Sequence, residues 1–107
     1  HPVTGQVTVD GKAAEGVYVQ FHQLGPAGRP LPDGARTDAD GKFRVPLHST
    51  GEYAVTAFWP VVTTVDDEEF EGEDRFRGQY RNLSRPALKV IVQIGQNELP
   101  TVDLTMR

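Results

Sequence analysis

The chain has 107 residues, the length of a single domain, and no cysteine, which excludes disulfides and thiolate metal sites. Its formal net charge at pH 7 is −4, whereas nucleic-acid-binding domains normally present a basic face. No apolar run approaches the ~20 residues of a membrane-spanning helix, so we expect neither a nucleic-acid partner nor a membrane span in this chain.

Seven segments show the strand pattern, in which apolar and polar residues alternate with a period of two. In chain order, these predicted strands are residues 3–9, 16–24, 35–37, 42–47, 52–59, 88–94 and 98–106. Turn and loop signals separate them: Asp10-Gly11 is a strong two-residue hairpin signal, and the glycines and prolines of residues 25–34 predict a loop. In the last segment, the apolar spacing after Leu99-Pro100 predicts a bulge or bend.

The stretch TDADGKF, residues 37–43, admits two interpretations. Spaced carboxylates before a glycine can belong to a calcium loop, but calcium takes six to eight oxygen ligands and this stretch offers two carboxylates. A tight turn explains the same residues, because Asp38 can hydrogen-bond the backbone two residues further on and Gly41 can adopt a positive φ. We therefore predict a turn between two strands, with a cation shared with the later acidic region as the open alternative.

Residues 61–86 are predicted to form a long acidic crossover loop, in which only residues 64–74 could form a helical turn. The simplest interpretation is a solvated connection that Phe76 and Tyr80 anchor on the domain and that Gly78 allows to bend tightly. The alternative is a loop that binds a partner or a cation, because long exposed loops are often functional and aromatics among charges suit protein or glycan contacts. The residues predicted to bind are Asp66, Asp67, Glu68, Glu69, Phe70, Glu71, Arg75 and Arg77.

The aromatic residues at the end of the fifth predicted strand divide between its two faces. Trp59 aligns with Tyr53 and Val55, so we expect it to pack in the core. Phe58 then faces outward and would form an exposed aromatic patch with Tyr18 if their strands are neighbours. Such a patch would suggest sugar stacking or docking on another domain.

Three stretches, "VTGQVTVDGKAAEGVYVQFH", "ARTDADGKFRV" and "GEYAVTAFW", resemble the signature of the carboxypeptidase regulatory-like domain. That domain belongs to the transthyretin-like (prealbumin-like) group. The resemblance implies an all-β, seven-stranded antiparallel Greek-key β-sandwich over residues 1–107. Later, "DRFRGQY" and "GQNELPTVDL" resemble the tail of a version common in small bacterial secreted and lipid-anchored proteins. The resemblance therefore implies an extracytoplasmic location, and the start at His1-Pro2 is what a trimmed mature segment would show, with a lipid anchor upstream compatible with it.

No catalytic set, metal site or cofactor is predicted from the residues that could carry chemistry. His22 falls on the outer face of its strand and His48 in a turn, while His1 is the remaining histidine. Ser49 and Ser84 lie in loops without the context of a nucleophile elbow. The histidine and tyrosine motifs of enzymes built on the transthyretin-like fold are absent.

We expect a non-catalytic extracytoplasmic module that binds a protein or a glycan or serves as a structural part of the cell envelope. Two alternatives stay open. A metal-dependent hydrolase or oxygenase would require the histidines and the acidic-loop carboxylates to converge. A transthyretin-like oligomeric carrier would bind a small ligand between subunits.

Overall fold

The computed structural model describes residues 1–24, 33–82 and 85–106, and these residues form eleven strands and no helix. In chain order, the strands are β1 (Pro2–Val9), β2 (Lys12–Ala13), β3 (Tyr18–Gln23), β4 (Asp33–Arg36), β5 (Lys42–Pro46), β6 (Gly51–Phe58), β7 (Pro60–Val65), β8 (Glu68–Asp74), β9 (Leu88–Val92), β10 (Asn97–Glu98) and β11 (Val102–Leu104). The loop predicted at residues 25–34 lies outside the described residues, except for its last two residues, which begin β4. The described part of the chain contains no helix with the length and hydrophobicity that crossing a membrane requires.

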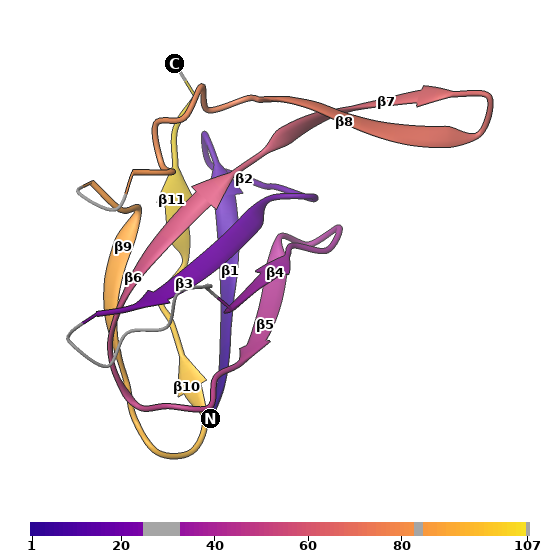
Figure 1. Ribbon diagram of the computed structural model, residues 1–107. Helices are drawn as coiled ribbons and strands as arrows, with labels where there is room; N and C mark the ends of the chain where they lie inside the picture. Colours follow the sequence, from indigo (N-terminus) through magenta and orange to yellow (C-terminus); the bar gives the residue numbers. More distant parts are fainter. Residues whose placement is uncertain (25–32, 83–84, 107) are drawn as a thin grey trace.

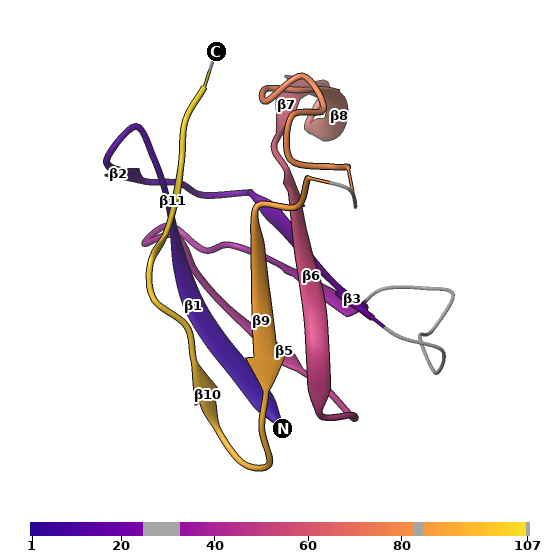
Figure 2. The ribbon, with the colours of Figure 1, turned by 90° about the vertical axis from the view of Figure 1, so that its left-hand side faces the viewer.

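Two sheets face each other across the core and make the chain an all-β, sandwich-like domain (Figure 2). In one sheet, β1 pairs antiparallel with β5 and with the short β2, and parallel with β10 and β11. The other sheet has the order β4-β3-β6-β9, and all its pairs are antiparallel. Each of the seven predicted segments overlaps at least one strand, although β4 begins two residues before its predicted segment and the short β2 was not predicted.

The last predicted strand, residues 98–106, forms two short strands instead of one. The backbone N–H of Leu99 still donates to the carbonyl oxygen of Thr4 at 2.9 Å, but Pro100 has no N–H to continue the ladder. Pairing with β1 resumes at Val102, so the predicted bend is confirmed. Both strands run parallel to β1, where antiparallel pairing was expected, because the chain enters this sheet from β9 in the opposite sheet and not through a hairpin from β1.

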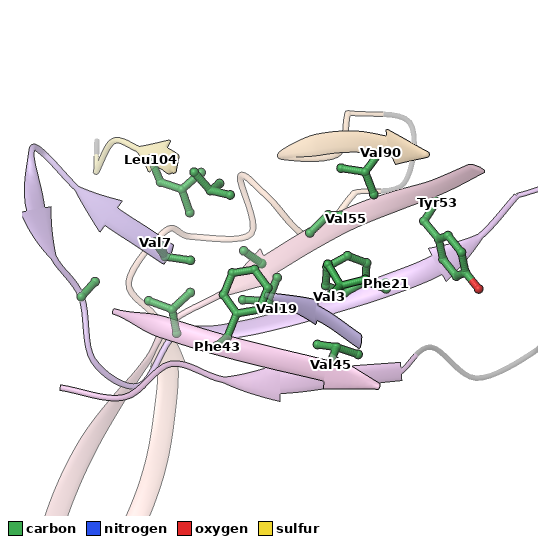
Figure 3. Packing of buried hydrophobic residues seen from close by; sticks show 14 of the residues in the cluster. Val3, Val7, Val19, Phe21, Phe43, Val45, Tyr53, Val55, Val90 and Leu104 are labelled. Atoms are coloured by element: carbon green, nitrogen blue, oxygen red, sulfur yellow. The ribbon is translucent and has the colours of Figure 1, made fainter. Parts of the chain in front are cut away.

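The core lies between the sheets and consists mainly of valines (Figure 3). The large side chains with the least exposure are Phe21, Leu47, Val3, Val7, Val17, Val19, Val45, Val55 and Val92. Gly5 belongs to the same face of β1 and pairs with Phe43 across the sheet. A Cβ atom on Gly5 would lie 2.6 Å from the ring atom Cζ of Phe43, so the missing side chain makes room for this ring.

The TDADGKF stretch forms the predicted turn between β4 and β5. The Asp38 carboxylate oxygen Oδ1 accepts the backbone N–H groups of Asp40 and Lys42, both at 2.9 Å. Gly41 has a φ of +74°, and a Cβ atom there would lie 2.4 Å from the carbonyl oxygen of Val7. Asp38 therefore caps the turn, and Gly41 provides the backbone conformation and the space that the turn needs.

The predicted crossover loop at residues 61–86 is wrong over its first half, and so is the helical turn at 64–74. Strands β7 and β8 form a separate two-stranded sheet, joined by the two-residue turn Asp66-Asp67. The run Val61–Val65 consists of β-branched residues, which favour extended backbone, and both turn residues have the positive φ that a tight hairpin requires. We call residues 60–74 the arm; it projects from the sandwich (Figure 1).

Candidate functional site

The outer face of the arm exposes apolar side chains. Directly opposite residues of an antiparallel pair lie on the same face, which places Thr63 with Phe70 and Val65 with Glu68. Val65 and Phe70 are about half exposed, at 52% and 51%, and Val61 near the base of the arm is 43% exposed. Two strands alone bury little apolar surface, so these side chains remain exposed to solvent.

The opposite face of the arm is polar and contacts the sandwich. Here Val62 lies opposite Glu71 and Thr64 opposite Glu69. The hydroxyl of Tyr18, at the start of β3, donates a hydrogen bond of 2.6 Å to Oε2 of Glu71. This bond, together with burial and the negative charge of Glu71, raises the pKa of Tyr18 above its ordinary value. Tyr18 therefore stays a neutral donor at physiological pH and ties the arm to β3.

Negative charge is concentrated on the arm. Seven of the fifteen Asp and Glu residues of the chain lie within residues 60–74, a stretch without Lys or Arg. The remaining eight acids are outnumbered by the eleven Lys and Arg residues of the rest of the chain. The molecule is therefore an acidic arm on a domain with a positive balance of charge.

Asp74 fixes the base of the arm. Its oxygen Oδ1 accepts the backbone N–H groups of Trp59 at 2.8 Å and Phe76 at 3.0 Å, and Oδ2 accepts that of Gly78 at 2.9 Å. The backbone N–H of Arg75 also donates to the carbonyl oxygen of Trp59 at 2.7 Å. Although the sequence placed Asp74 in a solvated acidic run, this carboxylate is a structural acceptor that joins the two ends of the arm.

The segment after the arm is anchored as predicted. Phe76 is buried, and its ring contacts the rings of Trp59 and Tyr80, with centroid distances of 5.8 and 5.0 Å. Tyr80 packs against the core, and its carbonyl oxygen accepts the backbone N–H of Ala57 at 2.9 Å. Gly78 has a φ of +79°, which confirms the tight bend.

A cleft of about 200 Å³ lies where the arm meets the sandwich. Its lining includes Glu15, Arg36, Trp59, Val62, Glu69 and Arg75. Trp59 was expected in the core; it is half-buried, packs against the core, and donates from Nε1 to the carbonyl oxygen of Glu15 at 2.9 Å. The guanidinium carbon of Arg75 lies 4.3 Å from the centre of the Trp59 ring, so an arginine covers part of the only tryptophan.

The condition for a patch of Tyr18 and Phe58 is met, because they form a directly opposite pair between the neighbouring strands β3 and β6. Their rings stack at a centroid distance of 4.8 Å and an interplanar angle of 11°. The guanidinium of Arg36 lies 5.8 Å from the Tyr18 ring, and that of Arg81 lies 4.7 Å from the Phe58 ring. The two rings are therefore covered by each other and by arginines, which leaves little bare aromatic surface.

The residues predicted to bind separate into two groups. Asp66 and Asp67 form the turn at the tip, and residues 68–71 lie in β8. Arg75 and Arg77 lie beyond the arm, on the sandwich side, where Arg75 contacts Trp59 and Arg77 has a φ of 54° in a turn. The acids and the arginines thus do not form one continuous loop surface.

Sequence reasoning missed the contacts that hold the arm, namely Tyr18 with Glu71 and Asp74 with three backbone amides. Nothing in the local pattern marks Asp74 among its acidic neighbours. The outward position of Tyr18 was visible from strand alternation, but its partner on a distant strand was not.

The residues that could carry chemistry do not assemble into a site within the described part of the chain. His22 Nε2 lies 2.8 Å from Oγ1 of Thr56, and burial lowers the pKa of His22 below its ordinary value. His48 is exposed, and Nδ1 of His1 accepts the backbone N–H of Gly95 at 3.3 Å. Ser84 lies outside the described residues. Residues 1–24, 33–82 and 85–106 contain no group of three His, Asp or Glu side chains arranged to hold a metal ion.

No protein-family model matches the chain, and no curated protein sequence matches it significantly. Among solved structures, the chain is similar to part of a 9R-lipoxygenase from Cyanothece, with a TM-score of 0.53 and 13% identity; the alignment covers 96% of this chain and 16% of the lipoxygenase chain. A DUF3823 family protein from Parabacteroides merdae aligns with a TM-score of 0.50 and 21% identity over 98% of this chain and 44% of that chain. Both similarities show the fold alone.

A third structure, a candidate carbohydrate-binding protein from Pseudomonas aeruginosa, has a TM-score of 0.47 and 14% identity over 97% of this chain and 86% of that chain. A similarity this low carries no argument about function. The chain spans less than half the length of each of the first two proteins, so their activities and partners do not transfer to it.

Proposed function

We propose that the chain is a non-catalytic, extracytoplasmic binding module that contacts a protein partner through the β7–β8 arm. The observation that carries this proposal is the arm itself, a two-stranded sheet that pairs with no other strand of the described residues. Val65 and Phe70 in this sheet are half-exposed, and most of its acids lie in solvent. A hairpin that stands apart from the core contributes little to the burial that holds the sandwich together. Its apolar face and its charge together are typical of an interaction surface.

A protein partner fits this surface better than a glycan does. Sugar rings stack on bare aromatic faces, whereas Arg75 lies over Trp59 and the rings of Tyr18 and Phe58 are stacked on each other. The aromatic residue that does face solvent, Phe70, is surrounded by acidic side chains on a narrow arm. Such a surface suits apolar and basic side chains of a polypeptide.

We also propose that the two sheets have the connections of a transthyretin-like fold. A transthyretin-like Greek-key domain that resembles the carboxypeptidase regulatory-like domain is supported by the two packed sheets and by the turn and core positions of the signature. The extracytoplasmic location is proposed from that resemblance alone. A small-ligand carrier built on oligomer interfaces stays an alternative, for which light scattering that finds only a monomer would be decisive.

The proposal is tested with an arm-deleted variant, in which residues 62–71 are replaced by Asn-Gly. A displayed peptide library is selected on the full chain, and each enriched peptide is then measured against the full chain, the arm-deleted variant and the exposed-acid control E52K. We expect peptides that bind the full chain and E52K but lose at least tenfold in affinity for the arm-deleted variant. Enriched peptides that bind all three proteins equally would show that the arm is not the interface. Glycans that bind the full chain and the arm-deleted variant equally on a glycan array would instead indicate a glycan-binding module whose site lies outside the arm.

A further inference from the structure

We propose that the free edge of β8 accepts a basic, extended segment of the partner polypeptide as an added strand. This inference deepens the proposed function and rests on it, because it names the chemistry of the partner that the arm binds. The alternative binding mode is contact through side chains alone.

The backbone geometry of the arm leaves β8 with open hydrogen-bonding groups. Within the described residues, β8 pairs with β7 and with no other strand, so its second edge has no ladder. Asp66 and Asp67 form a two-residue turn with φ values of 52° and 66°, which makes Val65 and Glu68 the hydrogen-bonded closing pair. Pairs along an antiparallel ladder alternate, so the backbone N–H and C=O groups of Glu69 and Glu71 point away from β7.

The side chains of β8 determine which side chains an added strand should carry. Glu69, Glu71 and Glu73 alternate along β8 with Phe70 and Gly72. A strand added to this edge would place its side chains on the same two faces in the same alternation. Basic residues opposite Glu69 and Glu71 and an apolar residue opposite Phe70 would therefore satisfy both faces over the regular part of β8, so the complementary segment begins basic, apolar, basic. The register of β8 shifts between Glu71 and Asp74, so a further basic residue would meet Glu73 beyond this irregularity.

Charge also excludes a second copy of this chain as the occupant. Pairing β8 with β8 of another molecule would bring glutamates opposite glutamates, and like charges directly opposite each other destabilise a ladder. Acids on an exposed edge thus prevent self-association while they attract a partner of opposite charge. A third strand would also stabilise a hairpin that is marginal with two strands, which links binding to ordering of the arm.

The test uses three capped heptapeptides with the full chain. The first is Thr-Lys-Val-Lys-Val-Lys-Thr, the second has the same composition with its three lysines adjacent, and the third is the first peptide with N-methyl groups on alternate residues at the edge that faces β8. Affinity is measured by calorimetry, and protection of the Glu69 and Glu71 amides by hydrogen exchange. Strand addition predicts that the first peptide binds and protects these amides, and that the other two lose at least tenfold in affinity.

Two protein variants complete the test. E69K/E73K reverses two charges beside the edge and keeps the Tyr18–Glu71 hydrogen bond, and E52K/E98K makes the same change in net charge on the sandwich. We expect the first variant to lose at least tenfold in affinity for the alternating peptide and the second to lose less than threefold. Equal binding of all three peptides, or no binding of the alternating peptide by a chain that still binds library-selected peptides through its arm, would overturn strand addition and leave the proposed function standing.

Discussion

At the scale of single residues, Thr37 explains how a polar side chain is accommodated in a valine-rich core. It is 4% exposed, and its hydroxyl donates to the carbonyl oxygen of Ala14 at 2.6 Å and accepts the backbone N–H of Val17 at 2.9 Å. Its own backbone N–H donates to the carbonyl oxygen of Val17 at 2.9 Å. One side chain therefore satisfies two buried backbone groups of the segment that leads into β3, a requirement that alternation in the sequence does not reveal.

Replacing Thr37 by valine should destabilise the domain, because the shape is kept but one buried donor and one buried acceptor lose their partner. We expect T37V to lower the free energy of unfolding by about 2–4 kcal/mol, measured by urea denaturation. T37S keeps the hydroxyl, so its free energy of unfolding should fall by less than that of T37V. A loss for T37S that equals or exceeds that of T37V would contradict the hydrogen-bond explanation.

His22 should make stability depend on pH. Burial lowers its pKa in the folded state below the ordinary value of 6.5, so the unfolded state binds more protons as pH falls through that value. The contribution of neutral His22 to stability is therefore complete above pH 6.5 and is lost as pH falls toward its folded-state pKa. Urea denaturation between pH 5 and 8 should show a slope that H22Q reduces, whereas an H22Q profile identical to that of the native chain would contradict the assignment.

At the scale of elements, the sandwich was largely predictable and the arm was not. Alternation located all seven sandwich segments because each has one buried face, as with Val3 and Val7 in β1. The arm has no buried face to impose alternation, and its turn, Asp66-Asp67, lacks the glycine that usually marks a two-residue hairpin. The continuous β-branched run Val61–Val65 was the available signal for a strand. The contacts of Tyr18 and Asp74 depend on strand order, which local patterns do not contain.

Asp74 should control the order of the arm. Asparagine in its place offers one oxygen to three backbone N–H groups and places its own NH₂ group against one of them. D74N should therefore lower the free energy of opening of the arm by about 1–3 kcal/mol. Hydrogen exchange of the arm amides should become faster in D74N, with a smaller effect on β1 and β6. E73Q is the matched control, because Glu73 is the exposed neighbour. Unchanged hydrogen exchange of the arm amides in D74N would mean that the Asp74 carboxylate does not fix the two ends of the arm.

Tyr18 provides a second, independent link to the arm. Y18F keeps the ring stacked on Phe58 and removes the hydrogen bond to Glu71. We expect Y18F to lower the free energy of local opening of the arm by about 1 kcal/mol. Hydrogen exchange of the β8 amides should become faster, with little change in the free energy of global unfolding. E98Q, which alters an exposed acid elsewhere, should leave β8 exchange unchanged. If Y18F and E98Q behave alike, the hydrogen bond to Glu71 contributes nothing to arm position.

At the scale of the whole molecule, the part that projects from the sandwich is also the part that is most acidic. The radius of gyration is 14.0 Å, compared with about 13 Å for a compact chain of this length, and the longest dimension is 43 Å against 28 and 25 Å for the others. Figure 1 shows the arm as the part that projects. The same segment carries nearly half of the acids. Attraction to the proposed basic partner would therefore act mainly on the arm and would weaken as salt screens it.

The most direct measurement is a comparison of the two-dimensional amide NMR spectra of the full chain and the arm-deleted variant. If the sandwich is complete without the arm, amide signals of β1, β5 and β9 will keep their positions, and changes will be confined to the surroundings of Tyr18 and Trp59. Collapse of the spectrum, or widespread shifts in those three strands, would mean that the arm is part of the fold and is not a separate element free to bind a partner.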